Sequence, residues 1–335
     1  MAVRGLHHIT AITADAPANV DFYARLLGLR MIKKTVNFDA PDVYHLYYAD
    51  ETGTPGTVLT FFEFPGVERG RAGAGMVHRI DWRVLDAPAQ SFWEQRLADA
   101  GVATRRADGA LVFADPEGLD HALVIDAGGD EGLVAQAPEV APEHALRGFA
   151  GVRAYASDPD ASAPLLTQAL ELTADSGTGG PTATATGARG ASDGGGTRSP
   201  GAEHGAWRTE GERPATLGYD PPPAEPGRQG AGSVHHIAWR VDDDDHLRAV
   251  RGRVGRAGAR PTEVIDRQYF HSVYFREPSG VLFELATAGP GFAIDEPPEA
   301  LGERLSLPPQ YEHLREQLER RLTPLTNPRS ARAGA

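Results

Sequence analysis

The chain repeats one order of elements four times, and this repetition limits its fold more than any other feature. Each copy begins with an apolar strand, continues through a helix that ends near a glycine in the clearest copies, and closes with further strands. Strands that follow one another through short turns run antiparallel, which excludes a doubly wound parallel sheet. The pattern therefore predicts an α+β protein of four βαβββ modules that form two barrel-like halves.

Changes in composition mark the boundaries between the copies. Residues 174–205, inside the third copy, are almost wholly Gly, Ala, Thr, Ser and Pro, which predicts a flexible insertion because they bury little apolar surface. Near the end, Leu314, Leu318 and Leu322 share one face of a predicted C-terminal helix. The predicted division is module 1 at 5–70, module 2 at 75–130, module 3 at 146–228, module 4 at 232–290 and a C-terminal extension at 296–335.

The opening strands of the first and fourth copies carry the same pair of histidines. GLHHITAI begins at Gly5 and SVHHIAWRV at Ser233, so His8 and His236 stand at corresponding positions. The closing strand of the fourth copy adds Glu284 between apolar neighbours, where a carboxylate is costly to bury unless a positive group meets it. Two imidazoles and one carboxylate are the facial triad that holds divalent iron with open coordination positions. We predict that these three side chains bind one metal ion.

The remaining copies provide an internal comparison for the ligand positions. Aligned by their own pattern, the second copy has Arg79 and Ala122 at these positions, and the third has Gly151 at the first of them. The first copy has Thr60 in the place of Glu284. Modules 1 and 4 are therefore predicted to pair around the metal. A carboxylate at the position of Thr60 would give four protein ligands, which suits proton transfer, whereas threonine leaves three ligands and room for a substrate oxygen and dioxygen together.

Composition excludes several other classes of protein. The 335 residues contain no cysteine, so a metal must be held by His, Asp or Glu, and a cysteine nucleophile is excluded. A formal net charge of −13 argues against nucleic acid as a partner, because phosphate binding needs clustered Lys and Arg. No apolar run approaches the roughly 18 residues of a membrane span, and no secretion signal is evident. A cytoplasmic protein without a membrane partner is expected, and a homo-oligomer is possible.

Several stretches of the sequence resemble the vicinal oxygen chelate superfamily of glyoxalases, bleomycin-resistance proteins and extradiol dioxygenases. They are LHHITAI, KKTVNFD, YHLYYAD with GTPGTVLTFF, VHHIAWRV and DRQYFHSVYFREPSGVLFELAT. More narrowly, the chain is similar to ring-cleaving dioxygenases that open hydroquinones. This resemblance implies an Fe(II)-dependent dioxygenase, with Mn(II) as the alternative metal, that acts on a small aromatic diol and O2.

The resemblance also implies roles for individual residues. His8, His236 and Glu284 match the iron ligands of the family. Five further residues match positions around the metal: His7, Thr10, His235, Arg267 and Tyr274. One of the two added histidines would take the proton that a diol loses on binding, and Arg267 or Tyr274 would stabilise negative charge that develops on oxygen. Strand alternation points His7 and His235 away from the metal face unless the strand ends twist.

Two other functions fit the same residues. One is an isomerase or lyase of glyoxalase type that uses Zn(II), Ni(II) or Mn(II), and the other is a metal-free protein that sequesters an aromatic compound. Four aromatic residues either line a ring-sized pocket or pack in the core: Tyr48, Phe62, Trp239 and Phe270. Four other histidines are interpreted as structural: His45, His78, His121 and His271.

Overall fold

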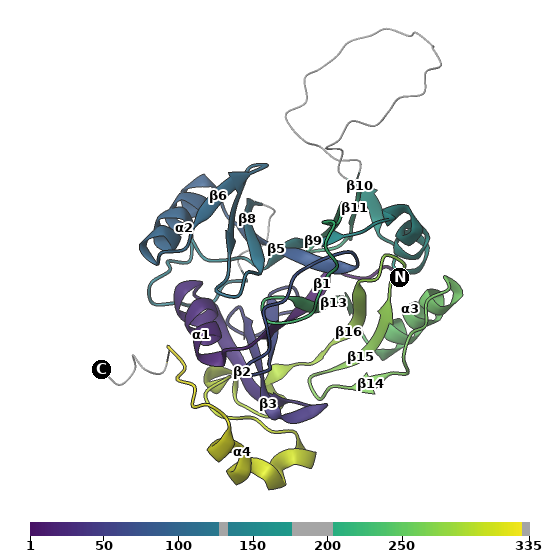
Figure 1. Cartoon of the computed structure of the whole chain (residues 1–335). Helices are drawn as coiled ribbons and strands as arrows, with labels where there is room; N and C mark the ends of the chain where they lie inside the picture. Colours follow the sequence, from purple (N-terminus) through teal and green to yellow (C-terminus); the bar gives the residue numbers. More distant parts are fainter. Residues whose placement is uncertain (127–132, 176–203, 330–335) are drawn as a thin grey trace, which may run out of the picture.

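The chain folds into two eight-stranded sheets with a few helices, and each sheet is built from two of the four copies (Figure 1). The computed structural model describes residues 1–126, 133–175 and 204–329. Each copy contributes a strand, a helical segment and three more strands. The predicted α+β fold of four βαβββ units in two halves is confirmed.

The first sheet joins the first and fourth copies. Its strands, in order across the sheet, are β14 (Ile265–Asp266), β15 (Phe270–Arg276), β16 (Leu282–Pro290), β13 (Val234–Val241), β1 (Leu6–Thr13), β4 (Val58–Glu63), β3 (Ala40–Ala49) and β2 (Arg30–Asn37). The helix α1 (Ala16–Val20) continues as a π-helical stretch, Asp21–Leu26, and α3 (Asp244–Arg256) belongs to the fourth copy. The central pair is β1 and β13, which run antiparallel.

The second sheet joins the second and third copies in the same arrangement. Its strands, in order, are β10 (Thr173–Asp175), β11 (His204–Arg208), β12 (Thr216–Asp220), β9 (Phe149–Tyr155), β5 (Met76–Val84), β8 (Asp120–Ile125), β7 (Ala110–Ala114) and β6 (Thr104–Ala107). The second copy has a regular helix, α2 (Ala87–Asp99). The third copy has a 3-10 turn, Pro159–Ser162, followed by a π-helical stretch, Leu165–Ala169.

The helices begin where the sequence places acceptor side chains. The carboxylate of Asp15 accepts a hydrogen bond from the amide of Ala18, and that of Asp243 accepts one from the amide of His246. In α3 the first turn carries Asp244 and Asp245, which interact favourably with the positive end of the helix dipole. The run of four aspartates, Asp242–Asp245, is thus explained by its place at the start of α3.

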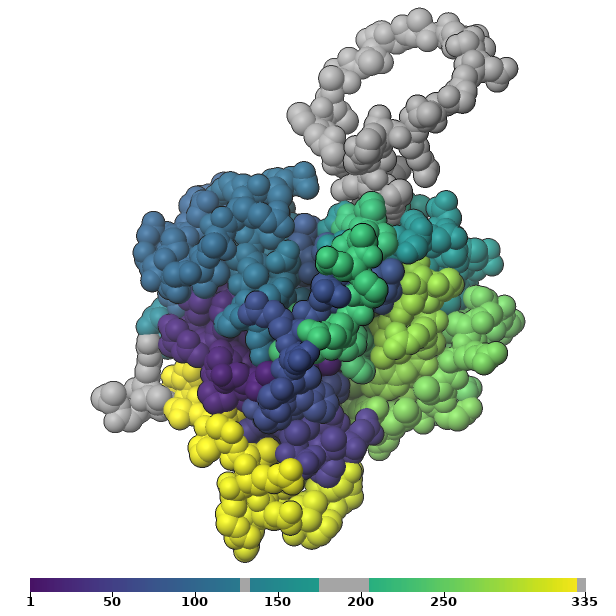
Figure 2. Space-filling model, viewed as in Figure 1, coloured from purple at the N-terminus to yellow at the C-terminus, as the bar shows by residue number. Residues whose placement is uncertain are grey.

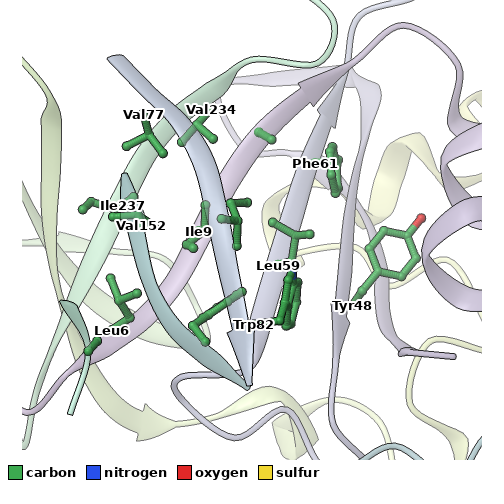
Figure 3. Packing of buried hydrophobic residues seen from close by; sticks show 14 of the residues in the cluster. Leu6, Ile9, Tyr48, Leu59, Phe61, Val77, Trp82, Val152, Val234 and Ile237 are labelled. Atoms are coloured by element: carbon green, nitrogen blue, oxygen red, sulfur yellow. The ribbon is translucent and has the colours of Figure 1, made fainter. Parts of the chain in front are cut away.

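The main core lies between the two sheets. Ile9 of β1 and Ile237 of β13 pack in one buried cluster with Val77 of β5 and Val152 of β9 (Figure 3). Side chains alternate along a strand, so the residues on either side of Ile9 and Ile237 lie on the opposite face of the first sheet, away from the second sheet. This arrangement sets up the site described below.

Two predicted segments differ in detail from the structure. The strands β10 and β11 extend two residues into each end of the predicted insertion 174–205, whose remaining part, 176–203, lies outside the described residues. The predicted C-terminal helix is divided into a 3-10 stretch, Pro309–Leu314, and the short helix α4 (Arg315–Arg321). Leu318 and Leu322 are buried, so the apolar face does pack against the protein as expected.

The C-terminal segment packs on the first copy. In Figure 2 it forms the yellow surface below the purple and blue surface of residues near the N-terminus. The Tyr44 hydroxyl donates to the carbonyl of Thr323, and Arg321 pairs with Asp42 at 2.9 Å. Within the residues that the structure describes, no helix combines the length and the apolar character that crossing a membrane requires.

His121 is buried in a hydrogen-bonded network that fixes its tautomer. Its Nδ1 accepts a hydrogen bond from Trp82 Nε1, and its Nε2 lies 3.0 Å from the Tyr23 hydroxyl, which itself donates to Asp115. The proton of the neutral ring therefore sits on Nε2. Burial lowers the pKa of His121 to about 3. This environment agrees with the structural role predicted for His121.

We expect this histidine to destabilise the fold as the pH falls. Below the ordinary imidazole pKa of about 6.5 the unfolded chain binds a proton that folded His121 does not, so stability is present above that pH and is lost toward pH 3. Between pH 7 and pH 5 the loss amounts to about 2 kcal/mol. In urea unfolding at pH 7 and pH 5, the free energy of unfolding should decrease less in His121→Phe than in wild type, and the difference should equal this amount. An equal loss in both proteins would contradict the assignment.

Candidate metal centre

Three side chains from neighbouring strands bring one potential ligand atom each to the same place in the first sheet. Nε2 of His8 lies 3.1 Å from Oε2 of Glu284, and Nε2 of His236 lies 2.9 Å from the same oxygen. The two imidazole nitrogens are 3.3 Å apart. All three side chains are buried, and they form a group that could hold a metal ion.

Strand pairing explains why residues so far apart in the sequence meet. Antiparallel pairing of β1 with β13 sets Thr10 opposite His236 and His8 opposite Ala238. Parallel pairing of β13 with β16 then sets Ala238 beside Glu284. The three candidate ligands therefore lie on adjacent strands and on one face of the sheet.

The contacts at Glu284 fit a metal ion better than a hydrogen-bonded cluster. Among the described residues, Oε2 of Glu284 has no hydrogen-bond partner of acceptable geometry, although two imidazole nitrogens lie about 3 Å away. Burial opposes the charge of this carboxylate, but the two imidazoles outweigh that effect and hold the pKa of Glu284 well below its usual value. Donors bound at about 2.1 Å to one ion, at right angles to each other, lie about 3 Å apart. The donor set therefore fits a divalent transition metal.

His7 and His235 support the candidate ligands because each sits in a β-bulge. The register between β1 and β13 shifts once at His7 and once at His235, so each is an extra residue in its strand. A bulge breaks the alternation of side chains, which is why neither follows the direction expected from strand alternation. Nδ1 of His7 lies 2.9 Å from Nδ1 of His8, and Nδ1 of His235 lies 2.8 Å from Nδ1 of His236. Each ligand ring is thereby oriented from behind, with Nε2 directed inward.

A pocket of about 430 Å³ opens beside the candidate ligands. His8 and His236 form part of its wall, together with four of the five residues implied by the family resemblance: Thr10, His235, Arg267 and Tyr274. Nε of Arg267 lies 3.3 Å from the Tyr274 hydroxyl, and its Nη1 pairs with Asp39 at 3.2 Å. His7, the fifth residue, is buried behind His8 and does not line the pocket.

The structure also decides the roles of the aromatic residues. Phe62 and Phe270 line the pocket, and the Phe270 ring lies 5.0 Å from the His8 ring. Tyr48 and Trp239 are fully buried in the core, and the Tyr48 hydroxyl donates to Asn19. Phe62 and Phe270 are thus among several aromatic rings on the pocket wall, which suits a flat, ring-shaped ligand.

Sequence reasoning missed three residues at the site: His45, Tyr47 and Ser272. His45, which was interpreted as structural, lines the pocket with Tyr47, because both share one face of β3. Ser272 of β15 donates a hydrogen bond to Oε1 of Glu284 and so holds the carboxylate from the other side. Alternation along β15 puts Ser272 on the face of Tyr274, which was the available signal. The other two histidines bind carboxylates, His78 that of Asp220 and His271 that of Asp244.

The corresponding positions in the second sheet carry no such donors. There β5 and β8 set Asp81 beside Ala122, as β13 and β16 set Ala238 beside Glu284. Arg79, which corresponds to His236, pairs with Asp81 at 2.6 Å. Across the described residues, the three candidate ligands in the first sheet are the one group of His, Asp and Glu side chains with metal-binding spacing.

We expect Ser272→Ala to weaken metal binding without preventing folding. Its hydroxyl orients the carboxylate of Glu284, and the loss of such a supporting group typically reduces metal affinity about ten- to a hundredfold. Titration of the metal against a chelator measures this change. Ser162→Ala is the matched control, because Ser162 hydrogen bonds to the buried carboxylate of Glu277 away from the candidate ligands. Equal affinities of wild type and Ser272→Ala would contradict the role of the hydroxyl.

Comparison with known proteins agrees with the paired βαβββ units and the site that they enclose. Residues 5–122 and 148–285 match the Glyoxalase/Bleomycin resistance protein/Dioxygenase superfamily, and the chain belongs to this superfamily.

Within the superfamily, the chain is similar to proteins named as ring-cleaving dioxygenases. It is 38% identical to "Putative ring-cleaving dioxygenase MhqO" of Bacillus subtilis, with 96% of each chain covered. It is 32% identical to the chlorohydroquinone/hydroquinone 1,2-dioxygenase of Sphingobium indicum, with 95% of each chain covered. A crystal structure described as a putative dioxygenase from Bacillus subtilis has a TM-score of 0.84 and 38% identity over 97% of this chain and 98% of that one.

Proposed function

We propose that this protein is an Fe(II)-dependent dioxygenase that opens the ring of a hydroquinone or a catechol-like phenol with O2. The observation that carries the proposal is the three-donor site of His8, His236 and Glu284, whose two histidines line an aromatic pocket. The names of the similar proteins support ring cleavage as the reaction. Mn(II) suits the same donors and is the alternative metal.

The position opposite Glu284 supports an oxygenase over an isomerase of glyoxalase type. Parallel pairing of β1 with β4 sets Thr10 beside Thr60, just as β13 and β16 set Ala238 beside Glu284. Thr60 thus occupies the place at which a fourth protein ligand would stand. His8, His236 and Glu284 would hold Fe(II) with three protein ligands, and the ion would then offer open positions to a diol and O2. A glyoxalase-type site with four protein ligands has fewer such positions.

The polar groups of the pocket wall act as hydrogen-bond donors in this proposal. A ligand imidazole that binds metal through Nε2 carries its proton on Nδ1, so His236 donates to Nδ1 of His235. Burial lowers the pKa of His235 to about 4, so the ring is neutral and its remaining proton is on Nε2. His235 can therefore donate to a substrate oxygen, and the role of base suggested by the resemblance does not fit this polarity.

The other wall groups have the same character. The Tyr274 hydroxyl lies within reach of Arg267 Nε–H, and as a phenol on the pocket wall it carries a hydrogen of its own. Burial is the largest of the effects that raise the pKa of Tyr274, so the phenol stays protonated. Donors on several sides favour the deprotonated form of a bound diol, since they stabilise negative charge on its oxygen. The pocket thus prepares the substrate for reaction by lowering the pKa of the diol, whose proton passes to water and not to a protein base.

Oxygen consumption tests the proposal directly. Protein prepared without oxygen and loaded with Fe(II) should consume one O2 per hydroquinone or substituted dihydroxybenzene and release a ring-opened product with both oxygen atoms. Metal-free and Zn(II)-loaded protein serve as controls and should consume none. Absence of uptake with every dihydroxybenzene tried, despite bound iron, would overturn the reaction class. Failure to retain any divalent metal would favour a protein that only sequesters aromatic compounds.

A further inference from the structure

Four side chains form a hydrogen-bonded chain along one side of the pocket. The Tyr47 hydroxyl lies 2.9 Å from Nδ1 of His45, and Nε2 of His45 lies 2.9 Å from Oγ1 of Thr60. Oγ1 of Thr60 donates to Oγ1 of Thr10 across 2.9 Å. Tyr47, His45 and Thr10 line the pocket, whereas Thr60 is fully buried between His45 and Thr10. The chain begins on β3 and ends beside His8 on β1.

The direction of every hydrogen bond in this chain is determined. Because Thr60 uses its single hydrogen on Thr10, it can only accept from His45, so the proton of His45 is on Nε2. Nδ1 of His45 then accepts from the Tyr47 hydroxyl. Burial is the largest effect that raises the pKa of Tyr47 and the largest that lowers the pKa of His45, so both groups are neutral. Each donor therefore points toward Thr10.

The chain ends on a hydroxyl whose own hydrogen is available to the pocket. Thr10 accepts from Thr60 and donates to no residue in the part of the chain that the structure describes. One lone pair of Thr10 Oγ1 accepts the hydrogen of Thr60. This contact restricts rotation about the Cβ–Oγ1 bond and directs the hydrogen of Thr10 away from Thr60. Thr10 shares a strand face with His8, two residues away, so this hydrogen faces the ligand side of the pocket.

We propose that Thr60, His45 and Tyr47 are positioning residues that hold the Thr10 hydroxyl as a donor to an oxygen of the bound diol. The inference rests on the proposed function and extends it to residues that do not bind the metal. The place of a fourth metal ligand is used by Thr60 to orient a donor instead. Ring contacts of His45 with Tyr47 at 4.1 Å and with Phe62 at 4.3 Å keep the imidazole in the plane that the chain requires.

A double-mutant cycle tests whether Thr60 acts through Thr10. Thr60→Val and Thr10→Val each remove one hydroxyl at nearly constant volume, and each should lower kcat/KM about tenfold. The double variant should also lose about tenfold, because Thr60 has nothing to orient once the Thr10 hydroxyl is gone. Losses that multiply to about a hundredfold would overturn the proposal. Thr60→Ser keeps the donor and should remain close to wild type.

A matched pair of variants examines His45. Glutamine can place an amide N–H where Nε2–H of His45 lies, so His45→Gln should retain most of the activity. His45→Leu removes the donor and should lose about tenfold in kcat/KM, in line with Thr60→Val. Equal activities of these two variants would show that His45 contributes only packing.

The tautomer of His45 provides a readout that does not depend on activity. In the Zn(II)-loaded full-length protein, nitrogen-15 NMR of the imidazoles should show His45 protonated on Nε2 with an accepting Nδ1. A proton on Nδ1 would overturn the proposed hydrogen-bond order from Tyr47 to Thr10, whether or not the protein is a dioxygenase. If the wild-type iron-loaded protein consumes no oxygen but His45 has the expected tautomer, the proposed function fails and the hydrogen-bond order from Tyr47 to Thr10 is retained. Normal turnover with multiplying losses in the cycle leaves the function standing and rejects the positioning role.

Discussion

Glu284→Gln is expected to release the metal and to abolish ring cleavage. The substitution removes the one negative charge among the three candidate ligands. It also replaces the carboxylate, whose Oε2 faces both imidazole nitrogens, by a neutral amide. Loss of a residue that only supports a ligand costs about ten- to a hundredfold in metal affinity, so loss of the ligand itself should exceed a hundredfold. Oxygen uptake should fall by about 10³-fold or more, because among the described residues no other Asp or Glu lies at metal-binding distance from the two imidazoles.

Glu277→Gln is the matched control for this substitution. Glu277 is also buried and lies in the turn between β15 and β16, where its carboxylate accepts from the amides of Ser279 and Val281. The control therefore repeats the chemical change in the same hairpin but outside the candidate ligands. Glu277→Gln should keep its iron. Its only expected defect is a lower free energy of unfolding. Elemental analysis after dialysis against a chelator separates the two variants, and stoichiometric iron in Glu284→Gln would refute its assignment as a ligand.

The sequence predicts the site because its four copies can be compared with one another. The sequence alignment of the copies makes Thr60 equivalent to Glu284. The structure agrees, because Thr60 pairs with Thr10 and Glu284 pairs with Ala238, and Thr10 and Ala238 are equivalent positions in their copies. The pairing of the first and last copies followed from the ligands alone, and the structure places their strands β1 and β13 side by side. Residue identities at equivalent positions thus carried long-range information that periodicity does not contain.

The sequence could not predict the parts of the site that depend on register. Every residue of β1 is buried, so burial does not reveal where its alternation breaks, and the bulges at His7 and His235 appear only when two strands are aligned. The contact of Ser272 with Glu284 requires the pairing of β15 with β16, and the contact of His45 with Thr60 requires that of β3 with β4. Tertiary packing, rather than local preference, decides these contacts.

Arg267 is held firmly by a segment from the end of the chain. It belongs to the turn between β14 and β15, whose next two residues, Gln268 and Tyr269, both donate to the carboxylate of Asp295 at 3.0 Å. The same carboxylate pairs at 2.6 Å with Lys33, a fully buried lysine of β2. The guanidinium of Arg267 lies over the Tyr274 ring at 5.3 Å. Fixed placement of this kind is what stabilisation of a developing charge requires.

Arg267→Met should lower kcat about a hundred- to a thousandfold while the metal content stays the same. Burial opposes the charge of Arg267, but Tyr274 and Asp39 outweigh that effect and hold the pKa of the guanidinium above its usual value, so the cation persists at every working pH. Removing one donor that faces developing negative charge typically costs about 10²- to 10³-fold in kcat. KM should change less, because this interaction strengthens as the charge develops.

Arg248→Met isolates the effect of position from that of the substitution. Arg248 lies on α3, where it is exposed and pairs with Asp244 and Asp245, outside the pocket. Its kcat should match that of wild type. Arg267→Lys keeps a point charge without the planar fork and should fall between wild type and Arg267→Met. If Arg267→Met instead loses iron at unchanged kcat per bound metal, Arg267 supports the metal site and has no direct part in stabilising charge on oxygen.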